Sequence, residues 1–409
     1  MPYLSPGVFV EEVPAAQRPI AGVGTSTAGF LGVVPDDVAM PFLPGRPLDP
    51  QNPVAADFET VATEGEAVLV TNWEQFKVNF GDFQAPQAGW SADLATAYQQ
   101  LQLAAFGFFL NGGTRCWCLR TATIASLQTP ANLTTHLNTL GGIDEIAMVA
   151  APGQVSNVFQ DALVAHCNAL EDRVAILDGQ PSPAALTPIE IRGGAGSATQ
   201  NDDYAAMYFP WIQVGDPLDA NARLSQPPSG HIAGIYARSD ARVGVHKAPA
   251  NEQVRGAVDV SPRLTRAEQD GLNPDGINVI RVFDGDIKLW GARTLGGDAH
   301  GLLKYISTRR YRNYVRESID EGTQWVVFEP NTPELWERIK RSVSGFLTTE
   351  WSEGRLFGET VDKAFFVKVD EENNPPAVRD LGQVIIEVGV AIVQPAEFVI
   401  FRIEQISGS

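Results

Sequence analysis

The stretch IAMVAAPGQVSNVFQDALVAHCNALEDRVAIL, residues 146–177, predicts the fold class of this chain. Two short apolar runs enclose a segment in which apolar side chains recur at helical spacing, namely Phe159, Leu163, Cys167 and Leu170. Two buried strands joined by an amphipathic helix form an α/β unit, which is typical of mixed or parallel sheets covered by helices. We therefore expect an α/β (α+β) fold with mixed sheets flanked by helices.

Similar patterns extend outward from this unit in both directions. Apolar or alternating runs predict strands at 27–34, 115–120, 204–211, 277–283, 287–290, 302–307, 324–328, 365–369 and 384–393. Helical periodicity predicts helices at 71–80, 91–110, 229–237 and 310–321, and one that opens at Pro333; Ser229 is a candidate helix cap.

These elements favour two domains between separate terminal segments. We expect an N-terminal linker arm at 1–20, a first α/β domain at 21–270, a second domain at 271–383, and C-terminal strands with an arm at 384–409. The first domain is rich in loops between residues 35 and 90. At 409 residues the chain is long enough for several cores of this size.

Both ends of the chain are predicted to be strands. PGVFVEEV at 6–13 and EFVIFRIEQI at 397–406 alternate in side-chain direction, and proline separates each of them from the rest of the chain. A strand at a terminus has N–H and C=O groups that need partners. These groups can pair within the strand's own sheet, or the strand can add to a sheet of a neighbouring copy. The termini alone leave both possibilities open.

Composition and charge exclude several classes of protein. The chain is 44% hydrophobic and 19% charged, which indicates a globular protein. Its formal net charge of −19 argues against nucleic acid as a partner, because a phosphate backbone needs a basic surface. One stretch, 304–341, is locally basic and suggests either a specific acidic partner or a solvated face of mixed charge.

The sequence also predicts where the protein folds. No apolar run approaches the roughly 20 residues that span a bilayer. The start, MPYLSPGVFVEE, lacks the pattern of a signal peptide. We therefore expect folding in the cytoplasm and no direct insertion into a membrane.

Motifs that would indicate an enzyme are weak. The loop at 193–197 (GGAGS) has the glycines of a phosphate-binding loop but neither its lysine nor the order of a dinucleotide site. The five histidines are scattered, the three cysteines have no metal-binding spacing, and no GxSxG elbow is present. We expect no catalytic, cofactor-binding or metal site. The alternatives are a cytoplasmic α/β enzyme with no recognisable motif, or a binding module.

Seven strings of residues resemble one family. They are YLSPGVFVEE at 3–12, VHKAPAN at 245–251, LNPDGIN at 272–278, LWGARTL at 289–295, YISTRR at 305–310, FEPN at 328–331 and PAEF at 395–398. Through them the chain resembles the contractile tail sheath proteins of contractile-tailed phages, R-type pyocins and extracellular contractile injection systems. The resemblance is densest from about residue 230 to the end and in the first dozen residues.

The resemblance implies a structural function rather than a catalytic one. Members of this family polymerise helically around an inner tube and contract to drive the tube through the envelope of a target cell. The implied partners are other copies of the chain, the inner tube protein, and baseplate and tail-terminator or cap proteins. The particle is assembled in the bacterial cytoplasm, and tail-like particles are released. Whether the parent is a phage, a bacteriocin or an injection system stays open.

The resemblance also implies roles for particular residues. The terminal arms are exchanged between subunits, so inter-subunit strand pairing is expected at Val8, Phe9, Val10, Glu11, Phe398, Val399, Ile400, Phe401 and Ile403. The domain at 271–383 is then the inner domain and the one at 21–270 the outer domain. Tube contact is expected from the helix at Pro333 through Arg338, Lys340 and Arg341.

Overall fold

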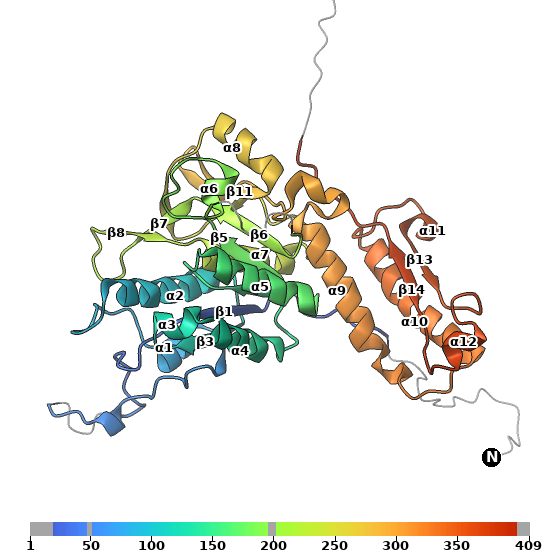
Figure 1. The fold of residues 1–409 in the computed structure, drawn as a ribbon, viewed down its shortest axis with the longest axis horizontal. Helices are drawn as coiled ribbons and strands as arrows, with labels where there is room; N and C mark the ends of the chain where they lie inside the picture. The colour runs from blue at the N-terminus through green and yellow to red at the C-terminus, as the bar shows by residue number, and fades with distance from the viewer. Residues whose placement is uncertain (1–18, 47–50, 195–201, 399–409) are drawn as a thin grey trace, which may run out of the picture. The chain divides into compact units, whose positions relative to one another are not determined.

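A computed structural model describes residues 19–46, 51–194 and 202–398 of the chain (Figure 1). The described residues divide into two compact units. The sheet unit consists of Val23–Tyr314 and the chain from Gln394 onward, and the hairpin unit consists of Val315–Val393 and the chain up to Gly22.

The sheet unit is built on a nine-stranded mixed sheet in the order β2-β3-β1-β4-β5-β6-β11-β12-β9. Six neighbouring strands, from β3 to β11, are parallel, and antiparallel strands complete both edges. The strands are β1 (Ala28–Val33), β2 (Ala67–Val70), β3 (Cys116–Thr121), β4 (Met148–Ala150), β5 (Val174–Asp178), β6 (Ala205–Phe209), β9 (Glu252–Gln253), β11 (Ile277–Phe283) and β12 (Asp286–Leu289).

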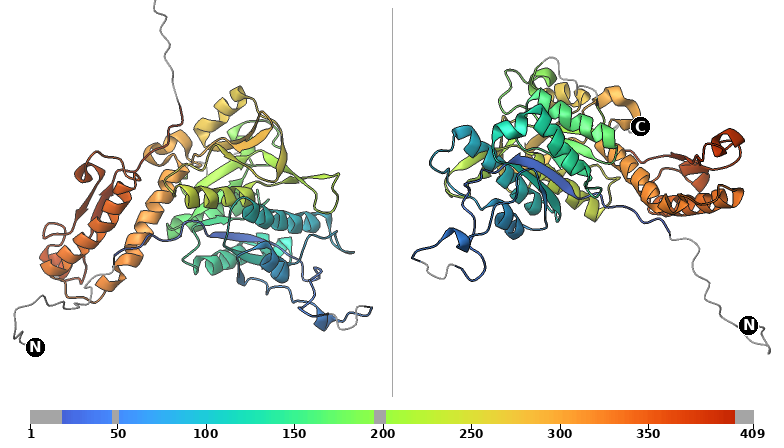
Figure 2. Two further views of the ribbon diagram at one scale, coloured as in Figure 1. Left: turned by 180° about the vertical axis from the view of Figure 1, so that it is seen from behind. Right: turned by 60° about the horizontal axis from the view of Figure 1, so that its bottom comes forward.

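Helices cover both faces of this sheet, because side chains on successive residues of a buried strand point to opposite faces. Apolar side chains on one face pack against α1 (Trp73–Phe80), α2 (Ala92–Leu110) and α7 (Ser229–Arg242). Those on the other face pack against α4 (Pro130–Gly141) and α5 (Asn157–Leu170). The sheet lies between these layers (Figure 2). The predicted α/β fold with helices flanking a mixed sheet is confirmed.

Smaller elements complete the sheet unit. A three-stranded antiparallel sheet has the order β10-β7-β8. The remaining elements are β7 (Trp211–Gly215), β8 (Arg223–Gln226), β10 (Ala257–Ser261), α3 (Ile124–Gln128), α6 (Pro188–Ile191), α8 (Arg266–Leu272) and the 3-10 helices η1 (Ala55–Asp57), η3 (Asn273–Asp275) and η4 (Gly297–Leu303). Helix α9 (Ile306–Thr323) begins in this unit and ends in the hairpin unit.

The hairpin unit packs one long helix on a two-stranded antiparallel sheet. Helix α10 (Pro333–Ser352) buries the apolar stripe that the sequence predicts, including Leu335, Ile339 and Val343. The sheet pairs β13 (Phe365–Lys368) with β14 (Glu387–Val390), and Phe365 and Val367 are buried. The short elements are η5 (Gln324–Val326), α11 (Val361–Ala364) and α12 (Pro376–Arg379).

The domain boundary expected near residue 271 lies instead after Tyr314. Strand β11 pairs in parallel with β6, and β12 pairs with β11, so both strands expected in the second domain belong to the nine-stranded sheet. A parallel pair needs partners distant in sequence. Because β11 pairs with a strand about 70 residues earlier, the local sequence around residue 271 does not show that the chain continues in the same unit.

Three local predictions are also wrong. The segment 302–307 forms the end of η4 and the start of α9, and 324–328 forms a 3-10 turn with exposed ends, although both runs favour strands. Neither run finds a sheet to join, and tertiary context overrides strand propensity. Ser229 does not cap α7; its backbone N–H donates to the Asp178 carboxylate at 2.8 Å, so a side chain from β5 serves the first turn of the helix.

Candidate functional site at the roots of the terminal arms

The residues expected to pair between subunits lie mostly beyond the described chain. Val8, Phe9, Val10 and Glu11, and at the other end Val399, Ile400, Phe401 and Ile403, fall outside the described residues. Phe398 is described; it is 70% exposed and belongs to no strand. The structure therefore informs on the roots of the two arms, where each joins the folded body.

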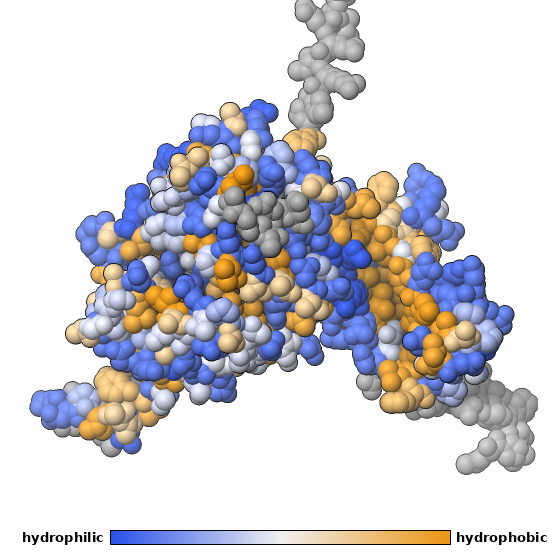
Figure 3. Space-filling view, viewed as in Figure 1, coloured by the Kyte–Doolittle hydropathy of each residue, from blue (hydrophilic) through white to orange (hydrophobic). Residues whose placement is uncertain are grey.

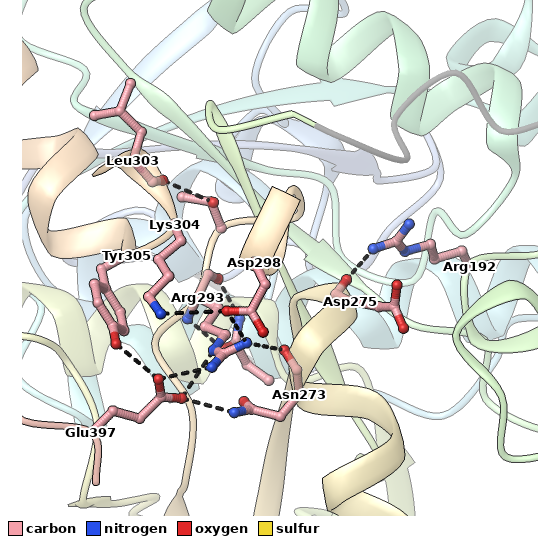
Figure 4. Close-up of polar contacts among 11 residues, drawn as sticks. Arg192, Asn273, Asp275, Arg293, Asp298, Leu303, Lys304, Tyr305 and Glu397 are labelled. Carbon is pink, nitrogen blue, oxygen red and sulfur yellow. Dashed lines mark hydrogen bonds and ion pairs between the residues drawn. The ribbon is translucent and has the colours of Figure 1, made fainter. Parts of the chain in front are cut away.

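The root of the C-terminal arm is a partly buried cluster around the Glu397 carboxylate (Figure 4). The Arg293 guanidinium donates to both Glu397 oxygens, from Nε and from Nη2, each at 2.9 Å. Asn273 Nδ2 and the Tyr305 hydroxyl each donate to the carboxylate at 2.8 Å. Four hydrogen bonds use the acceptor capacity of a carboxylate fully. Paired two-point contacts of this kind fix orientation as well as distance.

Arg293 has further contacts besides those with Glu397. Its side chain is 3% exposed, and its Nη1 contacts the Asn273 carbonyl at 3.0 Å and Asp298 at 3.1 Å. Its backbone N–H donates to Asn278 Oδ1 at 2.7 Å, and Asn278 lies on β11, between β6 and β12 of the nine-stranded sheet. The guanidinium is thus positioned by the nine-stranded sheet itself.

Two glycines allow the backbone around this cluster to close up. Gly276 has φ +77°, and a Cβ there would lie 2.2 Å from the Thr294 carbonyl oxygen. Gly297 has φ +52°, and a Cβ there would lie 2.1 Å from the Pro274 carbonyl oxygen. Only glycine fits these positions without strain. The strings LNPDGIN and LWGARTL, which ten residues separate in the sequence, are therefore in close backbone contact at this root.

Electrostatics favour the charged forms of the central pair. Burial alone would raise the pKa of Glu397, but the hydrogen bonds from Arg293, Asn273 and Tyr305 outweigh it and hold the pKa below its ordinary value. Burial and the hydrogen bond to Glu397 raise the pKa of Tyr305 to about 12, so its hydroxyl stays a donor. The cluster is therefore intact over the neutral pH range.

The root of the N-terminal arm is held by a second buried ion pair. Arg310 on α9 donates to the two Asp240 oxygens at 3.0 and 2.6 Å, and both side chains are 3% exposed. Arg310 also donates to the Thr25 carbonyl at 2.9 Å, and the Thr25 hydroxyl donates to Asp240 at 2.7 Å. The chain is thus fixed to α7 and α9 just before β1 begins.

The hairpin unit offers a sheet with open edges. Among the described residues, β13 and β14 form a sheet of only two strands, and each has one edge that pairs with no other strand. Directly after β14, Ile392 forms an antiparallel bridge with Leu356, so that part of the edge is already covered. Several large apolar side chains of this unit are exposed, namely Phe328, Phe357, Phe366, Leu381 and Ile385. Figure 3 shows hydrophobic residues gathered over this part of the chain. An isolated two-stranded sheet is marginally stable, so added strands would stabilise it.

The three basic residues expected to contact the tube do not share one environment. Arg338 stacks on the Trp325 ring, 4.6 Å from its centroid, and pairs with Glu329 at 3.3 Å. Lys340 and Arg341 are exposed on α10, on the side away from its buried stripe. Arg309 and Arg310, which contribute to the basic stretch in the sequence, are buried against Asp203 and Asp240.

Groups with the chemistry of a catalytic site are sparse in the described part of the chain. No cluster of three or more histidine, cysteine or acidic residues there could hold a metal ion. The three cysteines, Cys116, Cys118 and Cys167, are free and buried. Asp178 has a pKa raised by burial to about 6, yet its bonds serve Gly153 and Ser229 and it is 2% exposed. Within the described ranges, no helix combines the length and the apolar character needed to cross a membrane.

The sequence predicts that Glu397 begins the terminal strand and gives it no further role. In the structure Glu397 lies outside any strand, and its carboxylate accepts hydrogen bonds from Arg293, Asn273 and Tyr305. One signal was present: a lone arginine in the apolar run LWGARTL needs an acidic partner if it is buried. One acidic partner, Asp298, lies five residues further along the chain, but the other, Glu397, lies 104 residues away, and spacing gives no way to find it.

Comparison with known proteins agrees with this architecture. Residues 128–295 match the phage tail sheath protein central domain, and residues 299–406 match the phage tail sheath C-terminal domain. A sheath-class architecture is therefore present from the middle of the nine-stranded sheet to the end of the chain. The chain belongs to the phage tail sheath protein family.

The chain is also similar to a curated tail sheath protein. A putative prophage major tail sheath protein of Pseudomonas aeruginosa is 26% identical over 266 residues, which cover 63% of this chain and 64% of the relative. The alignment thus spans just under two thirds of that protein's length.

Solved structures match over the whole chain. A chain of the anti-feeding prophage baseplate gives a TM-score of 0.73 at 27% identity and covers 98% of this chain and 99% of the other. A chain of the contracted sheath complex of the extracellular contractile injection system PVC also gives 0.73, at 25% identity, with 99% and 98% covered. The fold of the present chain is thus similar to that of proteins from contractile injection systems.

Proposed function

We propose that this chain is the structural subunit of a contractile sheath, which polymerises around an inner tube and shortens to drive that tube through a target envelope. The observation that supports this most is the match over at least 98% of both chains to proteins from the anti-feeding prophage and PVC particles. The particle would be a phage tail or a tail-like injection device. The family is a structural one, and its function needs no active site.

The terminal arms would link the copies. The open edges of β13 and β14 suit strand addition, in which main-chain hydrogen bonds give affinity and alternating side chains give register. The N-terminal segment with Val8, Phe9 and Val10, and the C-terminal segment from Phe398 to Ile403, would pair with the 384–393 region of other copies. Subunits linked in this way can rotate as rigid bodies while staying connected.

Further partners follow from this assignment. The hairpin unit, as the larger part of the inner domain, would face the tube through Lys340 and Arg341, and the sheet unit would form the outer domain. The baseplate and a terminator or cap protein would bind the two ends of the polymer. Assembly would take place in the bacterial cytoplasm, with release of the finished particle.

Imaging tests the proposal directly. Purified full-length protein, with and without its inner tube protein, should form hollow helical tubes visible by electron microscopy. A monodisperse globular protein under all assembly conditions would contradict it.

Deleting residues 1–14 tests the arms separately. These residues precede the Thr25 root, so the truncated protein should stay folded and soluble but fail to polymerise. Circular dichroism provides the folding control. Normal sheaths built by the truncated protein would show that the N-terminal arm is not the link.

A further inference from the structure

The Glu397 cluster ties the last described residues to the sheet unit rather than to the hairpin unit that precedes them. Strand β14 ends at Val390, and from Gln394 the chain belongs to the sheet unit again. Glu397 lies 104 residues beyond Arg293, its two-point partner. The contact therefore closes a long loop that contains the whole hairpin unit.

Glu397 is not needed to satisfy the charge of Arg293. Asp298 pairs with Arg293 at 3.1 Å, and the Asn273 carbonyl accepts a further hydrogen bond at 3.0 Å. Lys304, at 3.3 Å, balances Asp298 in turn. A buried arginine that already has an acid partner does not require a second one for folding. The second acid therefore serves the segment that bears it.

We propose that Glu397 is a positioning residue that fixes the origin of the C-terminal arm on the sheet unit, so that load on an exchanged arm passes through Arg293 into the nine-stranded sheet. Without the cluster, load would reach the body through residues 391–393 and the two-stranded sheet. The inference rests on the proposed function, because it assigns a role in arm exchange.

The N-terminal root shows the same chemistry. Thr25 is fixed by the buried Arg310–Asp240 pair, and Arg310 lies five residues after Tyr305, which donates to Glu397. Thr25 and Glu397 are therefore both held next to the first turn of α9, although residues 19–22, on the way to the N-terminal arm, belong to the hairpin unit. Load on the C-terminal arm would reach the sheet unit close to the point where Thr25 is fixed.

Three full-length variants test the role of Glu397. Glu397→Gln keeps the shape but removes the charge, and Glu397→Ala removes all four hydrogen bonds. Glu359→Gln is the matched control, since Glu359 forms an exposed ion pair with Lys363 at 3.1 Å. Each is compared with the wild type for melting temperature as a monomer and for yield of sheath on the inner tube.

A second readout separates anchoring from stability. The native cysteines are buried, so a spin label attaches selectively to Phe398→Cys, which is exposed. In monomers the label should be strongly restricted when Glu397 is present and several-fold more mobile with Glu397→Ala. The Glu359→Gln background should leave its mobility unchanged.

The outcomes are distinct. We expect Glu397→Ala to melt within a few degrees of wild type and to yield at least tenfold less sheath, with Glu397→Gln in between and the control normal. Equal label mobility in the Glu397→Ala and wild-type backgrounds would overturn the proposal even if the variant unfolds more easily. Normal sheath yield from Glu397→Ala would also overturn it, leaving the sheath function intact. Failure of the wild type to form sheath would refute the proposed function instead.

Discussion

At the scale of single residues, the molecule uses buried charge and close contacts where chain segments must be held. Glu397 accepts four hydrogen bonds, and Arg310 donates to Asp240 and to the Thr25 carbonyl. Removing Asp240 would leave the buried Arg310 charge uncompensated, which costs far more than breaking an exposed pair, whereas Arg293 keeps Asp298 when Glu397 is removed. Residues such as Lys340 and Arg341, which are exposed, suit contacts that must form and release.

Reversing two exposed charges on α10 tests the tube contact. Lys340→Glu with Arg341→Glu should reduce tube-templated, extended assembly at least tenfold, because exposed ion pairs of up to about 1 kcal/mol each add over many copies. Arg338 is left in place, since it packs on Trp325 and pairs with Glu329. The assay is electron microscopy of the sheath assembled on purified tubes.

A control variant has the same change in net charge, placed on the sheet unit instead of on α10. Arg255→Glu with Arg266→Glu alters two exposed residues of the sheet unit and should leave extended assembly unaltered. Extended particles at normal yield from the α10 variant would show that these two residues do not bind the tube.

His231 gives the sheet unit a pH-dependent stability. Burial lowers the pKa of His231 from 6.5 to about 4, so the folded protein holds it neutral. Its contribution is fully present above pH 6.5 and is lost as the pH falls toward 4, because the unfolded chain binds the proton first. The loss amounts to roughly 3 kcal/mol. Burial also lowers the pKa of His166 to about 4, so His166 likewise destabilises the fold as the pH falls. Burial raises the pKa of Asp178 to about 6, so protonation of Asp178 stabilises the fold over the same pH range.

His231→Leu isolates this effect. Between pH 6.5 and 4 its unfolding free energy should fall less steeply than that of the wild type, by up to about 1.4 kcal/mol per pH unit. Urea titrations at several pH values give the pH dependence of the unfolding free energy for each protein. Only the two slopes are compared, so a difference in absolute stability between the proteins does not affect the result. Parallel slopes would show that His231 does not stay neutral in the fold.

At the scale of elements, the nine-stranded sheet depends on a close crossing of α2 and α7. Helix α7 presents Gly230 and Gly234 toward α2, and Gly107 of α2 faces the His231 ring. A Cβ at Gly230 would lie 2.5 Å from the backbone Cα of Ala104. Backbone cannot move aside as a side chain can, so glycine sets the distance between the two helices.

Gly230→Ala should therefore destabilise the protein although alanine favours helices. We expect a loss of about 1–3 kcal/mol from overpacking. The matched control is Gly271→Ala near the end of α8, where a Cβ would meet nothing within 4 Å and alanine should be neutral or stabilise by up to about 1 kcal/mol. Chemical denaturation gives the unfolding free energy of both variants. Equal values for the two variants would refute the claim that Gly230 is needed for close packing of α2 and α7.

The sequence predicts elements better than it predicts how they join. Periodicity correctly indicates β4, α5 and β5, and the cap and proline at Thr332–Pro333 mark the start of α10. These signals are local, because each depends on residues within a turn or two. The boundary after Tyr314 and the Glu397–Arg293 contact depend on strands and side chains that meet across about a hundred residues. A single sequence contains no spacing rule for such contacts.

At the scale of the whole molecule, the proposed function requires a source of energy for contraction. We propose that this energy comes from the contacts between copies. A sheath that shortens without chemical fuel must bury more surface, or pair more charge, when contracted. The apolar residues exposed on the hairpin unit, Phe328 and Phe366 among them, would provide such surface, as would the proposed acidic outer domain.

Contracted sheath should therefore resist denaturant better than extended sheath. We expect extended particles to convert in one direction, and contracted sheath to dissociate only at a higher guanidinium concentration. Light scattering during a guanidinium titration of each form makes the comparison. Equal midpoints, or refolding within 146–177, would contradict rigid-body contraction powered by new contacts.

The central claim is that copies of this chain are joined by arms anchored at Glu397 and Thr25, and one reconstruction tests it most directly. Electron cryo-microscopy of sheath assembled from the full-length chain on its tube should show strands from two other copies added to β13 and β14. It should also show each Glu397 bound to Arg293 of its own chain. Arms folded back onto their own sheet, or Glu397 released from Arg293 in the assembled sheath, would contradict the account.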